Sequence, residues 1–518
     1  MTRIFSTLFG MLLLLLACFP AGAEETATET EIEQALADLS GQDQVAQEAA
    51  VRTLVERGEA SLLPRLEELR LSADRSLRLL IKPVIDLLKS RANLASEDPD
   101  TRRSAATDLG MMGKPAAIPW LEAALKTEPD RWVRYTIEEA IGLLRLASDD
   151  PATKVAAATR LGELRSQNAL PALKELVSAS AVPVEGPALG GQAAPQGQGE
   201  VAKAAAQAVE RIETWGSWVS AIETLFRGIS LSSILLLMAL GLAIIFGLMG
   251  VINMAHGELM MLGAYATFLT QEGFKVYLPA GLFDYYFLAA MPCSFLAAGL
   301  FGLFLEATLI RFLYGRPLET LLATWGVSLI LIQAARVIFG DLTSVVAPSW
   351  LSGGAQVLVG VQLPYNRLFI IALSALCVAG IYLFLFKTGI GLKVRAVMQN
   401  RSMSACLAIP TRKVDAYTFA FGSGLAGLAG CALTLIGNVE PGLGQNYIVD
   451  SFMVVVTGGV GKLAGTIVAA LGIGGLNKLL EPSFGAVYGK VLILVLVILF
   501  LQRRPSGLFT IKGRQLET

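Results

Sequence analysis

The stretch GLAIIFGLMGVINMAHGELMMLGAY, residues 241–265, decides the fold class. It is apolar along most of its length, but Asn253, His256 and Glu258 interrupt it, and His256 is the only histidine of the chain. Polar side chains at membrane depth are costly, and irregular backbone is tolerated there only where protein buries it or where it lines a cavity. The stretch therefore predicts two membrane segments that meet at a functional break.

The composition independently indicates a membrane protein. Of the 518 residues, 54% are hydrophobic and only 16% are charged, which is too apolar for a soluble chain of this length. The 42 basic and 43 acidic side chains nearly balance, and the basic ones in the carboxyl-terminal half fall between apolar segments instead of covering one surface. We therefore expect a lipid membrane, and no nucleic acid, as a partner.

We expect an all-α, polytopic membrane domain with about nine segments. The apolar stretches lie near 229–251, 255–271, 287–310, 318–339, 367–386, 415–437, 448–460, 464–480 and 486–502. Several are shorter than the ~20 residues that a spanning helix needs. The short ones flank two breaks, Asn253–Glu258 and Gly458–Lys462, which predicts half-helices that meet at irregular backbone.

The amino terminus predicts export. An apolar run followed by Ala21-Gly22-Ala23 is typical of a signal peptide, assigned to residues 1–23; a lipoprotein box ending at Cys18 is the alternative. Basic residues cluster in the loops near Arg311 and 387–413 and at the carboxyl terminus, so these parts should be cytoplasmic. Nine crossings are consistent with an exported amino terminus and a cytoplasmic carboxyl terminus.

The segment after the signal repeats itself. The motif that begins at Ala105 and continues to Leu121 recurs 52 residues later, from Ala157 to Leu173. Each copy has helical apolar spacing, a turn, and a proline in the first turn of a second helix, which resembles HEAT-like repeats. We expect a HEAT-like α-solenoid over 24–180, a linker and terminal helix over 181–225, and a transmembrane domain over 226–518.

Two apparent nucleotide-binding motifs do not indicate a nucleotide-binding site. The pattern from Gly422 to Gly427 matches G-x-G-x-x-G, but it lies inside a predicted membrane helix, where small residues serve helix packing. Gly461-Lys462 lacks the remaining residues of a phosphate-binding loop. Since the sequence also shows no metal-ligand or nucleophile-base spacing, we interpret the chain as a non-enzyme without a cofactor.

The break motif resembles the signature of the permease subunits of bacterial branched-chain amino acid and urea ABC importers, which usually have Phe where this chain has Met254. The resemblance covers about Phe226–Gly507. It implies a multi-pass protein of the bacterial inner membrane. It also implies four kinds of contact: a second permease subunit, two cytoplasmic ATP-binding subunits, a periplasmic substrate-binding protein and the lipid membrane.

Two sets of residues are candidates for function. Asn253, His256, Glu258 and Thr457 lie at the two breaks and are predicted to line the translocation pathway or its gate. The alternative for His256 and Glu258 is that they cap a half-helix without touching substrate. The alternative for the second break is that its glycines only allow close helix packing.

The basic segment Gly389–Ile409 resembles the family's cytoplasmic coupling segment, except that Ala408 stands where glycine is usual. The residues that match are Arg395, Gln399, Asn400, Ala405 and Ile409. A plain positively charged cytoplasmic loop is the alternative, but it does not explain the helical apolar spacing within the segment.

The sequence favours urea as the substrate, because the exported repeat domain resembles the front end of the urea-importer member. Branched-chain or other amino acids are the alternative within the same architecture. A membrane-anchored periplasmic scaffold or sensor is the alternative of another class, although nine segments exceed what anchoring needs.

Overall fold

A computed structural model describes residues 22–39, 44–58, 60–72, 74–181, 198–505 and 507–509. Residues 1–21, with nearly all of the predicted signal peptide, and residues 182–197, in the predicted linker, lie outside the described residues. The chain divides into two compact units, Met1–Ser217 and Trp218–Thr518, which we name the solenoid unit and the membrane unit.

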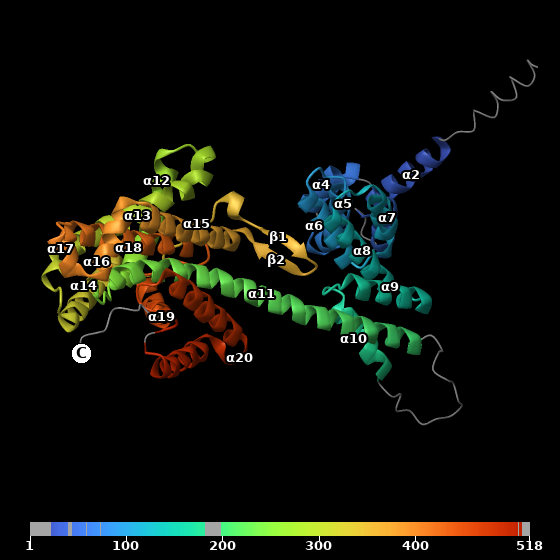
Figure 1. The fold of residues 1–518 in the computed structure, drawn as a ribbon. Helices are drawn as coiled ribbons and strands as arrows, with labels where there is room; N and C mark the ends of the chain where they lie inside the picture. Colours follow the sequence, from blue (N-terminus) through green and yellow to red (C-terminus); the bar gives the residue numbers. More distant parts are fainter. Residues whose placement is uncertain are drawn as a thin grey trace, which may run out of the picture. The chain divides into compact units, whose positions relative to one another are not determined.

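The solenoid unit is built from helices alone within its described residues (Figure 1). Its elements are α2 (Gly22–Leu39), α3 (Gln44–Arg57), η1 (Ala60–Leu62), α4 (Leu63–Ser72), α5 (Arg75–Asn93), α6 (Pro99–Met111), η2 (Pro115–Ala117), α7 (Ile118–Thr127), α8 (Arg131–Leu146), α9 (Pro151–Leu164), α10 (Leu170–Ala181) and the first part of α11 (Gln198–Met249).

The repeat of 52 residues is a repeat of structure. Asp98 caps α6 by accepting from the backbone N–H of Thr101, at 3.1 Å, and Asp150 caps α9 by accepting from that of Thr153, at 2.9 Å. A Cβ added to Gly110 would lie 2.9 Å from Ala140 Cα, and one added to Gly162 would lie 2.9 Å from Ala208 Cα. The first part of α11 therefore packs on α9 as α8 packs on α6.

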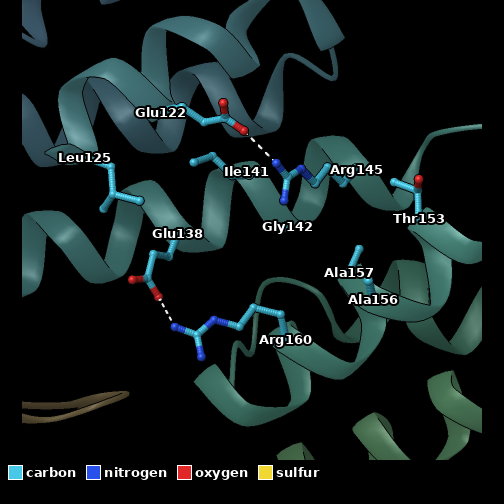
Figure 2. Close-up of a pocket in the computed structure, with 10 residues that line it drawn as sticks. All are labelled: Glu122, Leu125, Glu138, Ile141, Gly142, Arg145, Thr153, Ala156, Ala157 and Arg160. Carbon is cyan, nitrogen blue, oxygen red and sulfur yellow. Dashed lines mark hydrogen bonds and ion pairs between the residues drawn. The ribbon is translucent and has the colours of Figure 1, made fainter.

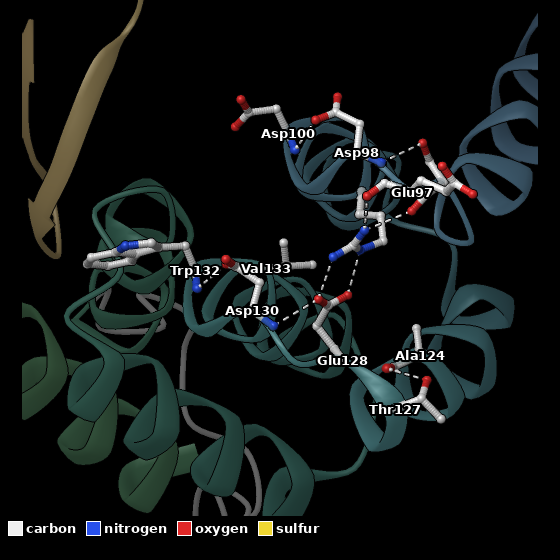
Figure 3. Close-up of polar contacts among 11 residues, drawn as sticks. Glu97, Asp98, Asp100, Ala124, Thr127, Glu128, Asp130, Trp132 and Val133 are labelled. Atoms are coloured by element: carbon white, nitrogen blue, oxygen red, sulfur yellow. Dashed lines mark hydrogen bonds and ion pairs between the residues drawn. The ribbon is translucent and has the colours of Figure 1, made fainter. Parts of the chain in front are cut away.

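Charged side chains tie the solenoid helices to each other. Arg102 in α6 donates two hydrogen bonds of 2.8 Å to the Glu128 carboxylate, and it also donates to the carbonyl oxygens of Ser96 and Glu97 (Figure 3). Glu128 in turn accepts from the backbone N–H of Asp130. The carboxylate thereby holds α6 to the turn between α7 and α8.

The junction between α8 and α9 is a turn of four residues, whereas α6 and α9 are each followed by a second helix, α7 and α10. A groove of about 690 Å³ lies over α8 and α9 beside α7. Two ion pairs line it, Glu122 with Arg145 at 2.5 Å and Glu138 with Arg160 at 2.6 Å (Figure 2). The solenoid unit thus has a groove along α7, α8 and α9 that is lined by both charged and apolar side chains.

The membrane unit holds the rest of α11 and the remaining elements. These are α12 (His256–Tyr277), η3 (Ala280–Tyr285), α13 (Tyr286–Thr308), η4 (Ile310–Phe312), α14 (Pro317–Phe339), η5 (Ser349–Leu351), β1 (Gly354–Leu358), β2 (Val361–Pro364), α15 (Tyr365–Lys387), α16 (Gly389–Gln399), α17 (Arg401–Cys406), α18 (Thr411–Leu433), α19 (Leu443–Gly458) and α20 (Leu463–Arg503).

Six helices among the described residues are long and apolar enough to cross a membrane: Gly199–Gly247, Gly281–Phe312, Pro317–Phe339, Tyr365–Lys387, Thr411–Leu433 and Leu463–Arg503. The nine predicted segments differ from these in three ways. α12 is too polar to count, and α19 has only 16 residues. The last two predicted segments are present as two helices that meet at Gly485, whose backbone is not helical, but they count together as one span within α20. Helix ends do lie at both predicted breaks.

Two further predictions need correction. The terminal helix within 181–225 was expected to be separate from the first membrane segment near 229–251, but α11 runs unbroken from Gln198 to Met249. The expectation of an all-α protein is also wrong in one place, because β1 and β2 form an antiparallel hairpin. Gly360, with φ of 79°, makes its turn, and alternating residues on either side suit paired strands.

Helices α12, α13 and α18 pack on one another at the centre of the membrane unit (Figure 1). The apolar stretches of α11 and α18 are mostly buried inside the unit, whereas those of α14, α15 and α20 are mostly exposed. The exposed helices carry large apolar side chains such as Leu329, Leu376 and Val491, which suit contact with lipid or with another subunit. The first break follows the buried helix α11, whereas the second lies between α19 and the mostly exposed helix α20.

Candidate functional site

The first break is a short irregular segment between α11 and α12. Gly250, with φ of 63°, ends α11, and its N–H donates to Phe246 O at 3.0 Å. Asn253 Oδ1 accepts from the backbone N–H of Ala255 at 3.1 Å, which fixes the turn before α12 begins at His256. The sequence therefore interrupts the helix with a glycine and restarts it with an asparagine turn.

Helix α14 holds the break on one side. Thr324 Oγ1 accepts from the backbone N–H of Met254 at 3.1 Å, and Ser328 Oγ donates to Glu258 Oε1 at 2.7 Å. Thr324 and Ser328 are four residues apart, so both point from one face of α14. No pattern in the sequence indicated these contacts, because each joins residues that are 70 positions apart.

Helix α11 holds the break on the other side. His256 Nε2 lies 3.2 Å from Met238 O, and since a carbonyl oxygen only accepts, this nitrogen must carry the proton. In the neutral ring Nδ1 is then an acceptor. A Cβ added to Gly241 would lie 3.3 Å from His256 Cε1, so the imidazole fits closely against the α11 backbone.

Each of the three polar side chains uses one polar atom and leaves another without a partner. Asn253 and His256 are 0% exposed and Glu258 is 1% exposed. Asn253 Nδ2, His256 Nδ1 and Glu258 Oε2 are buried without a hydrogen-bond partner in the structure. An unsatisfied buried polar atom costs roughly 1–3 kcal/mol, so three of them within six residues make this break the candidate site.

The fourth predicted pathway residue, Thr457, lies at the second break. Its Oγ1 is also buried without a partner, while its carbonyl oxygen accepts from the N–H of Leu508 at 2.8 Å. The break ends at Gly461, whose Cα would lie 2.9 Å from a Cβ added to Gly247 of α11. The second break thus packs against the last turns of α11, close in sequence to the first break.

The predicted coupling residues fall into two groups. Gln399, Asn400 and Ala405 are exposed, although Asn400 Oδ1 also caps α17 by accepting from the N–H of Met403. Arg395 and Ile409 anchor the segment instead. The Arg395 guanidinium lies 4.8 Å from the centre of the Phe386 ring, and Ile409 packs on the buried core of the membrane unit.

The structure adds two exposed apolar residues to this segment: Met403, which the sequence analysis did not use, and Leu407, which counted only toward the helical apolar spacing. Met403 and Leu407 on this segment are 59% and 70% exposed, and their position beside charged residues could have drawn attention to them. The segment ends with the N–H of Ile409 donating to Ser404 O and that of Ala408 donating to Ala405 O. This motif puts Ala408 at φ of 58°, where glycine is the favoured residue.

Comparisons with known proteins agree with the two-unit division. Residues 224–501 match the family described as "Branched-chain amino acid transport system / permease component", and residues 31–142 match HEAT repeats. The chain is 30% identical over 295 residues to the high-affinity branched-chain amino acid transport system permease protein BraD of Pseudomonas aeruginosa, an overlap of 55% of this chain and 95% of BraD.

Two further relatives carry the same kind of name. The permease protein LivH of Salmonella typhimurium is 25% identical over 295 residues, 55% of this chain and 94% of that protein. The probable branched-chain amino acid transport permease protein LivH of Methanocaldococcus jannaschii is 27% identical over 305 residues, 55% of this chain and 91% of that protein. No solved structure matches the chain.

The family match covers more than half of the chain and the whole of the break, the coupling segment and α18. Permeases of this kind belong to ABC importers, which work with ATP-binding and substrate-binding partners. This chain therefore belongs to the family of branched-chain amino acid transport system permease components.

Proposed function

We propose that this chain is the permease of an ABC importer for branched-chain amino acids, and that the substrate passes the break between α11 and α12. The observation that carries the proposal is the half-used polar side chains of Asn253, His256 and Glu258. Capping and packing account for one polar atom of each side chain. They do not account for the second, which remains available for a substrate.

The chemistry of these free atoms suits an amino acid. A carboxyl oxygen of Glu258 can accept from an ammonium group, and Asn253 Nδ2 can donate to a carboxylate. Buried apolar neighbours, Val251 and Leu259, suit a branched aliphatic side chain. The prediction of urea rested on the repeat domain, whereas the names of the relatives refer to branched-chain amino acids, so the alternative prediction is better supported.

The remaining proposals concern orientation and partners. The basic segment of α16 and α17 faces the cytoplasm and receives the ATP-binding subunits, with Gln399, Asn400 and Ala405 in the contact. The solenoid unit lies in the periplasm, on the side of the substrate-binding protein. This chain is not an enzyme and carries no cofactor, because ATP is hydrolysed by its partners.

The substrate can be tested with the whole complex in proteoliposomes. We expect ATP-dependent uptake of labelled leucine that excess isoleucine or valine suppresses and excess urea does not. Uptake of labelled urea that leucine leaves unchanged would reject the amino acid and restore the earlier prediction. Uptake of leucine without ATP would instead indicate a passive channel.

A further inference from the structure

An arginine at the start of α17 reaches into the membrane unit. Arg401 donates through Nη1 to Asp415 Oδ1 at 3.2 Å and through Nη2 to Asp415 Oδ2, a two-pronged contact that fixes the angle between the groups. The Asp415 side chain is 1% exposed, and that of Arg401 is 44% exposed. A carboxylate buried this deeply depends on its cation, so the contact is costly to break.

A third element joins the contact. The Arg401 guanidinium lies 4.8 Å from the centre of the Tyr314 ring, which belongs to the turn between η4 and α14. α17 is otherwise exposed, apart from Ser404. Arg401 therefore ties the exposed helix α17 to α18 through Asp415 and to the start of α14 through Tyr314.

Helix α18 passes the constraint on to the break. A Cβ added to Gly422 would lie 2.7 Å from Gly241 O of α11, and Gly241 is the residue that the His256 ring faces. Further along α18, Gly430 lies directly against the backbone of Met260 in α12. Because backbone lies on backbone, no side chain can rotate to absorb a shift of α18, and α11 and α12 must move with it.

We propose that the ion pair of Arg401 and Asp415, which we call the pin, transmits movement of α17 to α18 and hence to the break at Asn253–Glu258. Arg401 is a positioning residue, since it touches neither substrate nor nucleotide. The proposal rests on the proposed function, because only a permease driven by ATP-binding subunits has such a movement to transmit.

The test compares uptake with ATP hydrolysis in the reconstituted whole complex. In Arg401→Met and in Asp415→Asn we expect leucine uptake per ATP hydrolysed to fall about tenfold, while hydrolysis itself continues. The double variant should be no worse than either single one, because one contact is lost in all three. Lys413→Met, which removes an exposed cation in the first turn of α18, is the matched control and should keep the wild-type ratio.

Arg401→Lys keeps the positive charge but cannot make the two-pronged contact with Asp415, so its leucine uptake per ATP should lie between that of the wild type and that of Arg401→Met. This variant also provides the test if Arg401→Met fails to insert into the membrane. Wild-type uptake per ATP in both Arg401→Met and Asp415→Asn would overturn the pin. So would equal losses in Lys413→Met, since any charge in this region would then suffice.

A second readout separates the pin from the identity of the substrate. Spin labels at Met403→Cys in α17 and Tyr417→Cys in α18, in a background without other cysteines, report the separation of the two helices. In the wild-type sequence this separation should stay constant when ATP binds, and with Arg401→Met it should change. If the complex does not transport leucine but the separation changes only in Arg401→Met, the proposed substrate is rejected and the pin is kept. If the separation changes equally in the wild type and in Arg401→Met, the pin is rejected.

Discussion

The solenoid unit and the membrane unit solve helix packing with different residues. In the solenoid unit, leucine and alanine side chains fill the core, and close glycine contacts are made to residues with side chains, such as Gly110 on Ala140 and, 52 residues later, Gly162 on Ala208. The membrane unit brings backbones together directly through glycine pairs: Gly241 with Gly422, Gly257 with Gly444, Gly263 with Gly427, and Gly458 with Gly465.

The difference follows from the solvent. Apolar burial stabilises helices that pack in water, so large side chains are useful in the solenoid unit. In lipid this driving force is absent between helices, and close van der Waals contact of small residues takes its place. Substitutions that enlarge a glycine should therefore disturb the membrane unit more than the solenoid unit.

The largest effect is expected at Gly257 in the first turn of α12. A Cβ there would lie 2.6 Å from Gly444 O, so Gly257→Val forces α12 and α19 apart at the break. We expect leucine uptake to fall by more than about tenfold, with less folded protein in the membrane. Gly273→Val on the same helix is the control, because no atom lies within 4 Å of its Cβ position. Equal losses in both variants would remove the packing explanation.

Local chemistry explains what the sequence could predict. The break could be predicted because the polar residues Asn253, His256 and Glu258 interrupt an apolar stretch. The solenoid could be predicted because equivalent copies of one repeat motif begin at Ala105 and Ala157. The position of the break and the repeated helices both appear in the structure. The pathway and coupling roles of these residues remain predictions.

Long-range contacts explain what the sequence could not predict. Nothing near Glu258 indicates that Ser328 binds it, and nothing near Arg401 indicates that Asp415 is buried beneath it. The continuity of α11 was missed because the terminal helix of 181–225 and the apolar stretch near 229–251 were treated as separate elements. The break motif could not decide between urea and an amino acid, because it resembles the signature of permeases for both.

A smaller effect is expected from the glycines of the solenoid unit. Gly110→Val and Gly162→Val should each destabilise their repeat by roughly 1–3 kcal/mol, since a Cβ meets an alanine at 2.9 Å in both places. Hydrogen exchange of buried amides in α6 and α9 of the full chain measures this, with Gly199→Val as the control in open space. A large loss at only one of the two sites would show that the repeats are not equivalent.

The ion pair of the solenoid unit should give a modest pH dependence. The hydrogen bonds from Arg102 hold the pKa of Glu128 below its ordinary value of 4.5. A carboxyl whose pKa is lowered in the folded state stabilises the fold above its unfolded pKa, and this stabilisation is lost as the pH falls through the folded pKa. Exchange protection in α6 should therefore decrease below about pH 4.5 more in the wild type than in Glu128→Gln. Identical pH profiles would mean that the pair contributes nothing.

The smallest effect concerns the two residues other than glycine with positive φ among the described residues, Arg165 and Ala408. Ala408→Gly should stabilise the end of α17 by about 1 kcal/mol, because glycine adopts this conformation without strain. Arg165→Gly should gain less, because it also removes the guanidinium that lies 4.0 Å from the Trp215 ring centre. Hydrogen exchange of the amides at the end of each helix measures both changes. An equal gain in stability in the two variants would show that the contact of Arg165 with the Trp215 ring contributes nothing.

Uptake by Glu258→Gln tests the central claim most directly. Glu258 and Glu272 lie on the same helix, but Glu258 is buried at the break whereas Glu272 is exposed and paired with Lys275 at 2.6 Å. In proteoliposomes with equal amounts of inserted complex, we expect Glu258→Gln to lose leucine uptake by about tenfold or more and Glu272→Gln to transport like the wild type. Wild-type uptake by Glu258→Gln would contradict the claim that the substrate meets these side chains at the break.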